Sequence, residues 1–267
     1  MVNLQDVRPE PAIRVVREGH VATVVLDRPD KKNAVTHGMW RHLAGLFDGF
    51  GGDDDLRAVI VRGAGTDFCA GADIAEFEAV RRDAATARDY EAANDAAFAA
   101  IRNCPVPVIA AIAGVCYGGG FGIAAAADIR IATPGASFSV PAARLGLAYP
   151  VAAMADIVNA VGVQTAKYLT FSAGRIDVSD ALRTGFIHEI VNDDALEGRA
   201  GALAATIAAN APLSVRASKA SIRAAVTGAR TDIDRAERLG KATFESGDYA
   251  EGRAAFAERR KPSFNGR

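Results

Sequence analysis

The sequence predicts an α/β fold with a helical C-terminal subdomain. Between residues 12 and 195, short apolar segments rich in β-branched residues alternate with segments of helical composition. From about residue 195 to the end, every segment has helical composition. We therefore expect two parts: a core over residues 1–195 and a helical region over residues 196–267.

Three elements and a long helix are expected in the N-terminal half. The segment "AIRVVREGHVATVVLDRP" predicts a β-hairpin with its turn at residues 18–20. Residues 36–50 form a predicted helix that stops at two glycines, and "LRAVIVRGAG" is a buried strand. A long helix from about Ile74 to Arg102 follows, where Asp73 and Glu76 have the spacing of a capping box.

The second half of the core begins with the predicted strand "VPVIAAIAG". A glycine turn, Gly118–Gly120, then leads into a short alanine-rich helix. Two short strands, "IRIAT" and "ASFSV", are expected on either side of a turn at Pro134-Gly135. After Pro150 the sequence predicts mostly helix, with one strand at "FIHEIV".

Composition excludes several classes of protein. The 267 residues carry a net charge of −1, which gives no general attraction for nucleic acid or an anionic membrane. The uncharged stretch 103–127 is broken by prolines and glycines, so we expect a buried strand, turn and helix there rather than a membrane span. No metal-ligand cluster or G-x-S-x-G motif occurs, and no metal site is expected.

The three cysteines indicate a reducing compartment. Cys69, Cys104 and Cys116 are an odd number without CxxC spacing, and the first residues lack the pattern of a signal peptide. We therefore expect buried thiols and a cytoplasmic location.

Three interpretations compete for the glycine turn. The glycines can allow a close contact between strand and helix, or Gly120-x-Gly122-x-x-Ala125 can be a dinucleotide fingerprint. The fingerprint is disfavoured because residues 129–155 contain no acidic residue for the ribose. In the third interpretation, amides at the helix start face a developing negative charge. The loop "DFCAGAD", which also joins a strand to a helix, is a second candidate donor and favours the third interpretation.

Six ordered segments resemble the crotonase, or enoyl-CoA hydratase/isomerase, superfamily. They are "LDRPDKKNAV", "FCAGADI", "GVCYGGGFGIAAAADIRIA", "FSVPAARLGL", "YLTFSAGRIDVSDALRTGFIHEIV" and "SGDYAEGRAAFAERRKPSFNGR". The resemblance implies a crotonase-like spiral of β-β-α units with a helical C-terminal subdomain. It also implies a homotrimer, or a hexamer made of two trimers, assembled through the C-terminal helices.

The same resemblance implies an acyl-CoA or enoyl-CoA thioester as the substrate. Its carbonyl oxygen would accept hydrogen bonds from the backbone amides of Ala70 and Gly119, each stabilising an enolate by roughly 3–4 kcal/mol. Coenzyme A is then part of the substrate, and no separate cofactor is expected. The resemblance places these residues around coenzyme A, with Phe264 reaching it from a neighbouring subunit: Lys32, Ala34, Ala70, Ala72, Asp73, Ile74 and Phe264.

The sequence departs from the family pattern at both glutamates that its hydratases use. The first position is Gly122 and the second is Ala142, so neither can move a proton. Tyr149 and Arg144 lie close to the second position and are our candidates for polar contacts with the substrate. Glu76 and Glu78 are further candidates to replace the missing carboxylates, although Glu76 is better explained by helix capping.

Three functional hypotheses follow. The first is an enzyme of this family that holds a thioester enolate but hydrates crotonyl-CoA poorly. The second is a non-catalytic acyl-CoA binding protein that has lost its acid–base pair. The third is a CoA-ester decarboxylase, in which Arg144 or Tyr149 would hold the leaving carboxylate.

Overall fold

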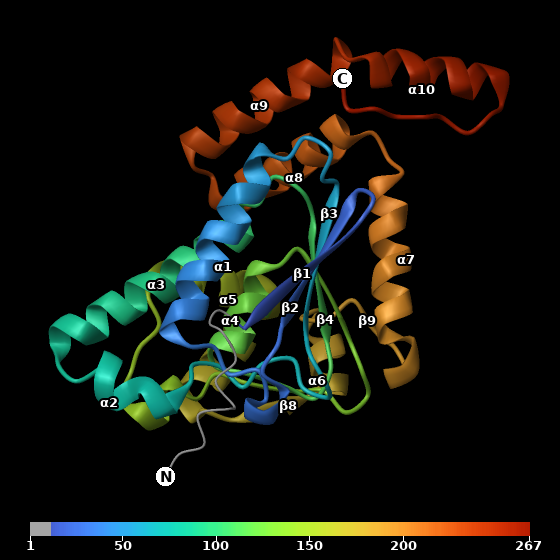
Figure 1. The fold of residues 1–267 in the computed structure, drawn as a ribbon. Helices are drawn as coiled ribbons and strands as arrows, with labels where there is room; N and C mark the ends of the chain where they lie inside the picture. The colour runs from blue at the N-terminus through green and yellow to red at the C-terminus, as the bar shows by residue number, and fades with distance from the viewer. Residues whose placement is uncertain (1–11) are drawn as a thin grey trace.

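A six-stranded sheet forms the centre of the computed structural model, which describes residues 12–267 (Figure 1). The first eleven residues of the predicted core lie outside the described part. The strand order is β1-β2-β3-β4-β6-β9, with β1 and β2 antiparallel and the other neighbours parallel. The strands are β1 Ile13–Glu18, β2 Val21–Leu26, β3 Ala58–Gly63, β4 Val108–Ile112, β6 Ile129–Ala132 and β9 Glu189–Ile190. The predicted hairpin and buried strands are thus confirmed.

A second sheet of three short strands lies beside the first. It has the order β5-β7-β8, with β5 Val115–Tyr117, β7 Ser137–Ser139 and β8 Arg175–Asp177. The sequence predicted β7 but neither β5 nor β8. The predicted strands "IRIAT" and "ASFSV" both exist, yet they belong to different sheets.

Helices cover both faces of the large sheet (Figure 1). The α-helices are α1 His37–Gly49, α2 Phe77–Val80, α3 Ala84–Asn103, α4 Gly119–Ala126, α5 Val151–Ser172, α6 Val178–Arg183, α7 Leu196–Ala208, α8 Pro212–Thr227, α9 Arg230–Phe244 and α10 Gly247–Glu258. Short 3₁₀ helices span Pro29–Lys31, Phe50–Gly52, Ile74–Glu76, Pro141–Leu145 and Asp193–Ala195.

Helix α7 packs on one face of the sheet, while α1 and α3 lie on the other (Figure 1). Leu196, Ala200 and Ala204 recur every four residues and contact the Ala58 and Ile60 side of β3. The intervening β3 residues face the main core, as the two-residue period of a strand requires. Helix α8 lies at one end of this sandwich, where the Lys219 amine donates to the Asp128 carboxylate at 2.6 Å, and α9 and α10 extend beyond it (Figure 1).

The predicted helix over residues 74–102 is interrupted. A 3₁₀ turn and the short α2 come first, and α3 begins only at Ala84. The break occurs because Asp83 forms a capping box with Thr86, accepting hydrogen bonds from the Ala85 and Thr86 amides at 2.9 and 3.0 Å. This second start signal divides the segment in two.

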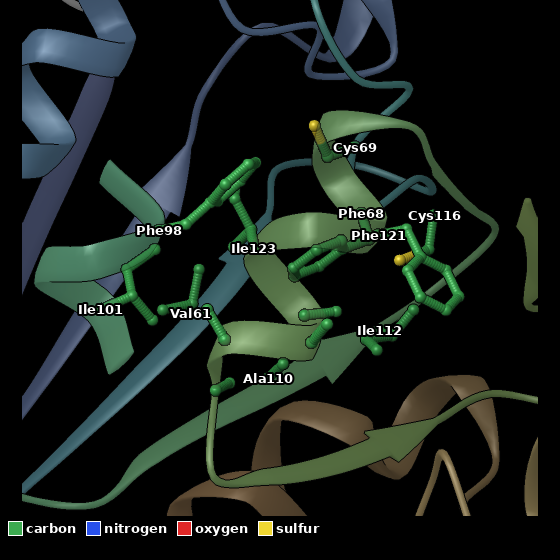
Figure 2. Packing of buried hydrophobic residues seen from close by; sticks show 14 of the residues in the cluster. Val61, Phe68, Cys69, Phe98, Ile101, Ala110, Ile112, Cys116, Phe121 and Ile123 are labelled. Atoms are coloured by element: carbon green, nitrogen blue, oxygen red, sulfur yellow. The ribbon is translucent and has the colours of Figure 1, made fainter. Parts of the chain in front are cut away.

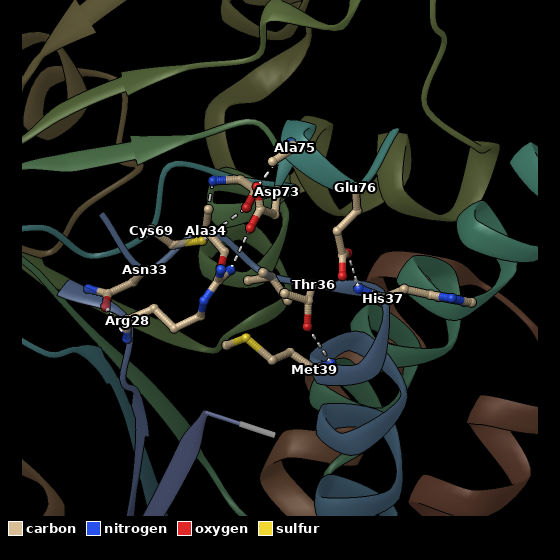
Figure 3. A network of polar contacts seen from close by, with 12 residues as sticks. Arg28, Asn33, Ala34, Thr36, His37, Met39, Cys69, Asp73, Ala75 and Glu76 are labelled. Carbon is tan, nitrogen blue, oxygen red and sulfur yellow. Dashed lines mark hydrogen bonds and ion pairs between the residues drawn. The ribbon is translucent and has the colours of Figure 1, made fainter. Parts of the chain in front are cut away.

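The predicted capping box at Asp73 is half right. Asp73 does cap the 3₁₀ turn, because its carboxylate accepts a hydrogen bond from the Ala75 amide at 3.0 Å. Glu76 does not return the contact: its carboxylate accepts from the His37 amide at 2.8 Å, across to the start of α1 (Figure 3). The prediction for Glu76 was wrong because a tertiary partner replaced the local one.

Helix α4 lies in the middle of the main core. Every residue from Gly120 to Ala126 is buried, and side chains of α3, α4 and β4 point into one cluster (Figure 2). Phe121 of α4 stacks on Phe186, with ring centroids 4.4 Å apart. The predicted segment 103–127 is therefore a strand, turn and buried helix, and no helix of residues 12–267 is long and apolar enough to cross a membrane.

The three cysteines are buried free thiols, as predicted. Desolvation raises the pKa of Cys69 to about 12 and also raises those of Cys104 and Cys116. These thiols therefore stay protonated and serve as packing residues.

We expect Phe186→Ala to lower the free energy of unfolding by about 3–5 kcal/mol, because it removes a fully buried ring from the α4 stack. Urea unfolding followed by circular dichroism measures the change. The matched control is Phe171→Ala: this side chain is 79% exposed, so the cost should stay within about 0.5 kcal/mol. Equal losses in both variants would contradict the packing described for Phe186.

Candidate functional site

The two loops predicted to donate hydrogen bonds lie side by side. Cys69 and Cys116 form an isolated parallel bridge, with the Cys69 amide 2.9 Å from the Val115 carbonyl oxygen. The Tyr117 amide returns the contact by donating to the Cys69 carbonyl at 3.0 Å. This bridge brings the end of the first loop against the start of α4.

Glycines allow the close approach of these loops. Gly71 has a φ of +102° and Gly118 a φ of +52°, a region that side chains disfavour. A Cβ on Gly71 would lie 2.9 Å from the Tyr117 carbonyl oxygen, and one on Gly119 would lie 2.7 Å from the ring of Trp40. Only glycine fits at either position.

The amides that remain accessible differ from the predicted pair. The Ala70 amide donates to the Lys32 carbonyl at 2.9 Å, which excludes it from the predicted contact with a thioester oxygen. The Ala72 amide has no hydrogen-bond acceptor among residues 12–267, and a Cβ on Gly119 would lie 3.6 Å from its nitrogen. Gly119 begins α4, so its own amide has no acceptor within the helix.

Hydrogen bonding within the loop explains why the accessible amide belongs to Ala72 and not to Ala70, two residues earlier. In this extended loop, the Val35 amide donates to Gly71 at 2.8 Å and the Asp73 amide donates to Val35 at 2.9 Å. Successive amides of an extended chain point in opposite directions, so the Ala72 amide faces away from this pairing. Sequence alignment by motif alone does not fix this register.

A cavity of 170 Å³ lies beside the Ala72 and Gly119 amides. Its walls come from the two glycine loops, from α2 and α3, and from the segment Pro141–Pro150. Most of the lining is apolar, which favours a ligand with a hydrocarbon portion.

Of the two candidates for polar contacts with the substrate, Tyr149 lines this cavity and Arg144 does not. A Cβ on Gly118 would lie 3.9 Å from the Tyr149 hydroxyl, so this phenol stands near the amide pair. Desolvation raises the pKa of Tyr149 well above its usual range, which keeps the hydroxyl protonated. Arg144 is exposed, whereas Ala142 of the same 3₁₀ turn, Pro141–Leu145, lines the cavity and the 57% exposed Leu145 lies at its rim.

Both positions expected to carry glutamates contribute no polar side chain. A Cβ on Gly122 would lie 2.5 Å from the ring of Phe98, which reaches the cavity from α3. Ala142 adds only a methyl group to the opposite wall. The space that one carboxylate would need is therefore already filled by an aromatic ring.

Three of the residues predicted to bind coenzyme A line this cavity: Ala70, Ala72 and Ile74. Ile74 is 68% exposed, so it forms part of the rim. Lys32 is exposed as well, with its amine 3.8 Å from the Asp67 carboxylate.

Asp73 and Ala34 have structural partners. The Asp73 carboxylate is 2.8 Å from the Arg28 guanidinium, and the same guanidinium donates to the Ala34 carbonyl at 2.7 Å (Figure 3). This network holds the loop before α1 against the loop after β3. Since Asp73 is only 8% exposed, its role in the described chain is structural.

Phe264 lies apart from these residues. Its ring is 3.6 Å from the position of a Cβ on Gly252 of α10, and it lines a different cavity, at the C-terminal helices. Within one chain the structure does not bring Phe264 to the cavity beside Ala72.

Sequence reasoning missed three polar residues of the cavity: Arg81, Glu91 and Asn94. The Arg81 guanidinium is 2.7 Å from the Glu91 carboxylate, and Asn94 follows one turn later on α3. The spacing of Glu91, Asn94 and Phe98 at i, i+3 and i+7 was the available signal for a common helix face. Of the glutamates that were considered, Glu76 is bound to the His37 amide and Glu78 is exposed outside the cavity.

Among residues 12–267 no group of three or more His, Cys, Asp or Glu side chains is placed to hold a metal ion. The polar groups that line the cavity are backbone amides, Tyr149, Asn94 and the Arg81–Glu91 pair.

We expect Gly122→Ala to lower the free energy of unfolding by about 1–3 kcal/mol, because the new methyl collides with Phe98. Combining it with Phe98→Leu should recover part of the loss. Chemical denaturation measures both variants. Gly201→Ala in α7 is the control: its Cβ would meet nothing within 4 Å, and it should stabilise the helix by up to about 1 kcal/mol. A neutral Gly122→Ala would show that Phe98 is not held against α4.

Comparison with known proteins identifies the family of the chain. A family model described as "Enoyl-CoA hydratase/isomerase" matches residues 17–267. The mouse (Mus musculus) mitochondrial Delta(3,5)-Delta(2,4)-dienoyl-CoA isomerase is 36% identical over 214 residues, or 76% of this chain, and the chain spans 65% of its length. The short-chain-enoyl-CoA hydratase of Clostridium acetobutylicum is 34% identical over 92% of this chain and 94% of its own.

Solved structures extend the likeness to the fold. An enoyl-CoA hydratase/carnithine racemase from Magnetospirillum magneticum has a TM-score of 0.89 at 37% identity, covering 96% of both chains. An enoyl-CoA hydratase from Bacillus anthracis also has a TM-score of 0.89, at 29% identity, covering 96% of this chain and 100% of its own. The predicted crotonase fold is confirmed, and the chain belongs to the enoyl-CoA hydratase/isomerase family.

Proposed function

We propose that the protein is an enzyme that binds an acyl-CoA or enoyl-CoA thioester and stabilises its enolate. The observation that carries this proposal is the convergence of two accessible amides, those of Ala72 and Gly119, at a mostly apolar cavity. A thioester carbonyl oxygen gains negative charge as an enolate forms, and preorganised amides in a water-poor site stabilise that charge. The Gly119 amide also lies at the N-terminus of α4, where the helix dipole favours an anion.

Coenzyme A would lie outside the cavity, on the side of the exposed Lys32 and Ile74. Ala34 and Asp73 then act indirectly, by fixing these loops through Arg28. Since Phe264 lies elsewhere in the chain, its predicted contact with the nucleotide requires a neighbouring subunit. We keep the trimer or hexamer as part of this proposal, supported by the exposed Phe244 and Phe256 on α9 and α10.

The family relatives carry names of different reactions, among them hydration and double-bond isomerisation. Hydration that depends on the two usual glutamates is disfavoured here because Gly122 and Ala142 replace them. Decarboxylation loses one of its two proposed clamps, because Arg144 is outside the cavity, and Arg81 is already paired with Glu91; Tyr149 remains as the other candidate. A non-catalytic binding protein becomes the conclusion if binding occurs without any turnover.

The amide contacts can be tested with a pair of ligands instead of a mutation. We expect butyryl-CoA to bind more tightly than the S-butyl-CoA thioether, which lacks the carbonyl oxygen, by roughly 1–3 kcal/mol for two hydrogen bonds. Isothermal titration calorimetry measures both, with free coenzyme A as the control for the nucleotide. Equal dissociation constants would show that no amide contacts the thioester oxygen, and failure to bind any acyl-CoA would end the proposal.

A second test uses crotonyl-CoA. We expect its hydration to proceed below roughly 1 per second, the lower end of ordinary enzyme turnover, because the usual acid–base pair is absent. Loss of the ultraviolet absorbance of the conjugated thioester measures the rate. Turnover within the ordinary range would contradict the role assigned to Gly122 and Ala142.

A further inference from the structure

One carboxylate lines the cavity. Among the described residues that form its walls, Glu91 is the only aspartate or glutamate, and no histidine, lysine or cysteine accompanies it. The other ionisable groups are Arg81, which does not give up its proton at physiological pH, and Tyr149, whose burial keeps it protonated. Glu91 is thus the one side chain of the cavity able to accept a proton.

Arg81 fixes the position of this carboxylate. The two groups are 2.7 Å apart, and the Arg81 side chain is only 9% exposed. Its guanidinium carbon lies 4.4 Å from the ring centroids of both Phe77 and Tyr90, so α2 and α3 hold it between them. A long side chain held in this way presents its ion-pair partner in a narrow range of positions.

Two residues beside Glu91 in the cavity wall, Arg81 and Asn94, have buried polar atoms without a hydrogen-bond partner in the described chain. Arg81 Nε and Nη1 and Asn94 Oδ1 are buried and have no hydrogen-bond partner among residues 12–267. Buried polar atoms are nearly always paired in folded proteins, so these three atoms mark a part of the wall where the described chain supplies fewer polar contacts than usual.

Glu91 also lies within electrostatic reach of the amide end of the cavity. Its negative charge contributes to the raised pKa of Tyr149, after burial, and the Tyr149 hydroxyl stands next to Gly118. The cavity volume of 170 Å³ is below the roughly 300–1,000 Å³ of pockets for larger ligands. A short acyl chain anchored at the amides therefore has to pass close to α3.

We propose that Glu91 is the general base of this site and moves a proton between two carbons of a short enoyl-CoA, so that the enzyme shifts the position of a double bond. This inference rests on the proposed enolate site at Ala72 and Gly119. The Glu91 carboxylate takes a proton from the carbon next to the thioester, and the C–H electron pair forms the enolate. The protonated Glu91 then returns the same proton to the carbon at the far end of the conjugated system, and the double bond moves by one position.

Isomerisation fits the number of carboxylates. A proton that leaves one carbon and returns to another needs a single group that alternates between base and acid, with no change in oxidation state and no water consumed. Hydration by the paired-carboxylate route needs one group to activate water and another to deliver a proton. The cavity contains one carboxylate, and Gly122 and Ala142 stand at the two positions where glutamates were expected.

Hydrogen exchange tests this role without knowledge of the natural substrate. The full-length protein is incubated with butyryl-CoA in D₂O, and deuterium at the carbon next to the thioester is followed by mass spectrometry. In parallel, conversion of 3-hexenoyl-CoA to the conjugated 2-enoyl isomer is followed by ultraviolet absorbance. We expect both activities in the native protein and a roughly 10²–10⁴-fold loss of each in Glu91→Gln, with butyryl-CoA still bound.

Two further variants separate the chemistry from folding. Glu78→Gln makes the same change at an exposed position outside the cavity and should leave both rates unaltered. Glu91→Asp keeps a carboxylate and should lose less activity than Glu91→Gln, which is the readout that remains if the glutamine variant folds poorly.

The outcomes distinguish this inference from the proposal beneath it. Binding of butyryl-CoA without exchange by the native protein, or exchange that Glu91→Gln leaves unchanged, overturns the role of Glu91 but not the thioester site. Equal losses in Glu91→Asp and Glu91→Gln also count against it. Absence of acyl-CoA binding overturns the proposed function and this inference with it.

Discussion

The contact between Gly71 and Gly118–Gly119 is the constraint on which the site depends. Two loops from neighbouring strands can meet at this distance only because no side chain lies between them and because two glycines adopt positive φ. The parallel bridge between Cys69 and Cys116 sets the register of the meeting. From it follow the orientation of the Ala72 amide, the start of α4 and the position of the cavity floor.

Packing of α4 in the core and an ion pair outside it hold the two loops in contact. Helix α4 starts at the meeting point and continues into the main core, where Phe121 and Phe186 hold it in place. On the outer side, Arg28 ties the loop before α1 to Asp73. Hydrogen bonds and packing thus fix the Ala72 and Gly119 amides, which we propose as the donors, before any ligand arrives; this is the condition under which backbone dipoles stabilise a developing charge most effectively.

Sequence alone predicted the architecture well where periodicity and glycine turns were long enough to read. The hairpin, β3, β4 and α4 were all recognisable from apolar runs and turn residues. The sequence-based prediction failed where a residue with the spacing of a local helix cap formed its hydrogen bond with a distant segment instead. Glu76 has the spacing of a cap but binds the His37 amide, and Asp83 introduces a second helix start that no apolar period reveals.

The same limit applies to the site. Motifs located the two loops, but the choice between the Ala70 and Ala72 amides depends on the pairing of the loop with Lys32 and Val35, residues more than thirty positions away. Glu91 carries no motif at all. It is recognised as a residue of the cavity only in the folded chain, where Glu91, Asn94 and Phe98 of α3 line the same wall.

The packing of Phe98 on Gly122 also limits how this protein can change over evolutionary time. A mutation that places a carboxylate at position 122 collides with an aromatic ring on α3, so it is costly until position 98 has become smaller. Shrinking position 98 first opens a void in the main core at a cost of its own. Each of the two substitutions is destabilising when it occurs alone. A pocket with a glutamate at position 122 is therefore reached only through a less stable intermediate, whichever helix changes first.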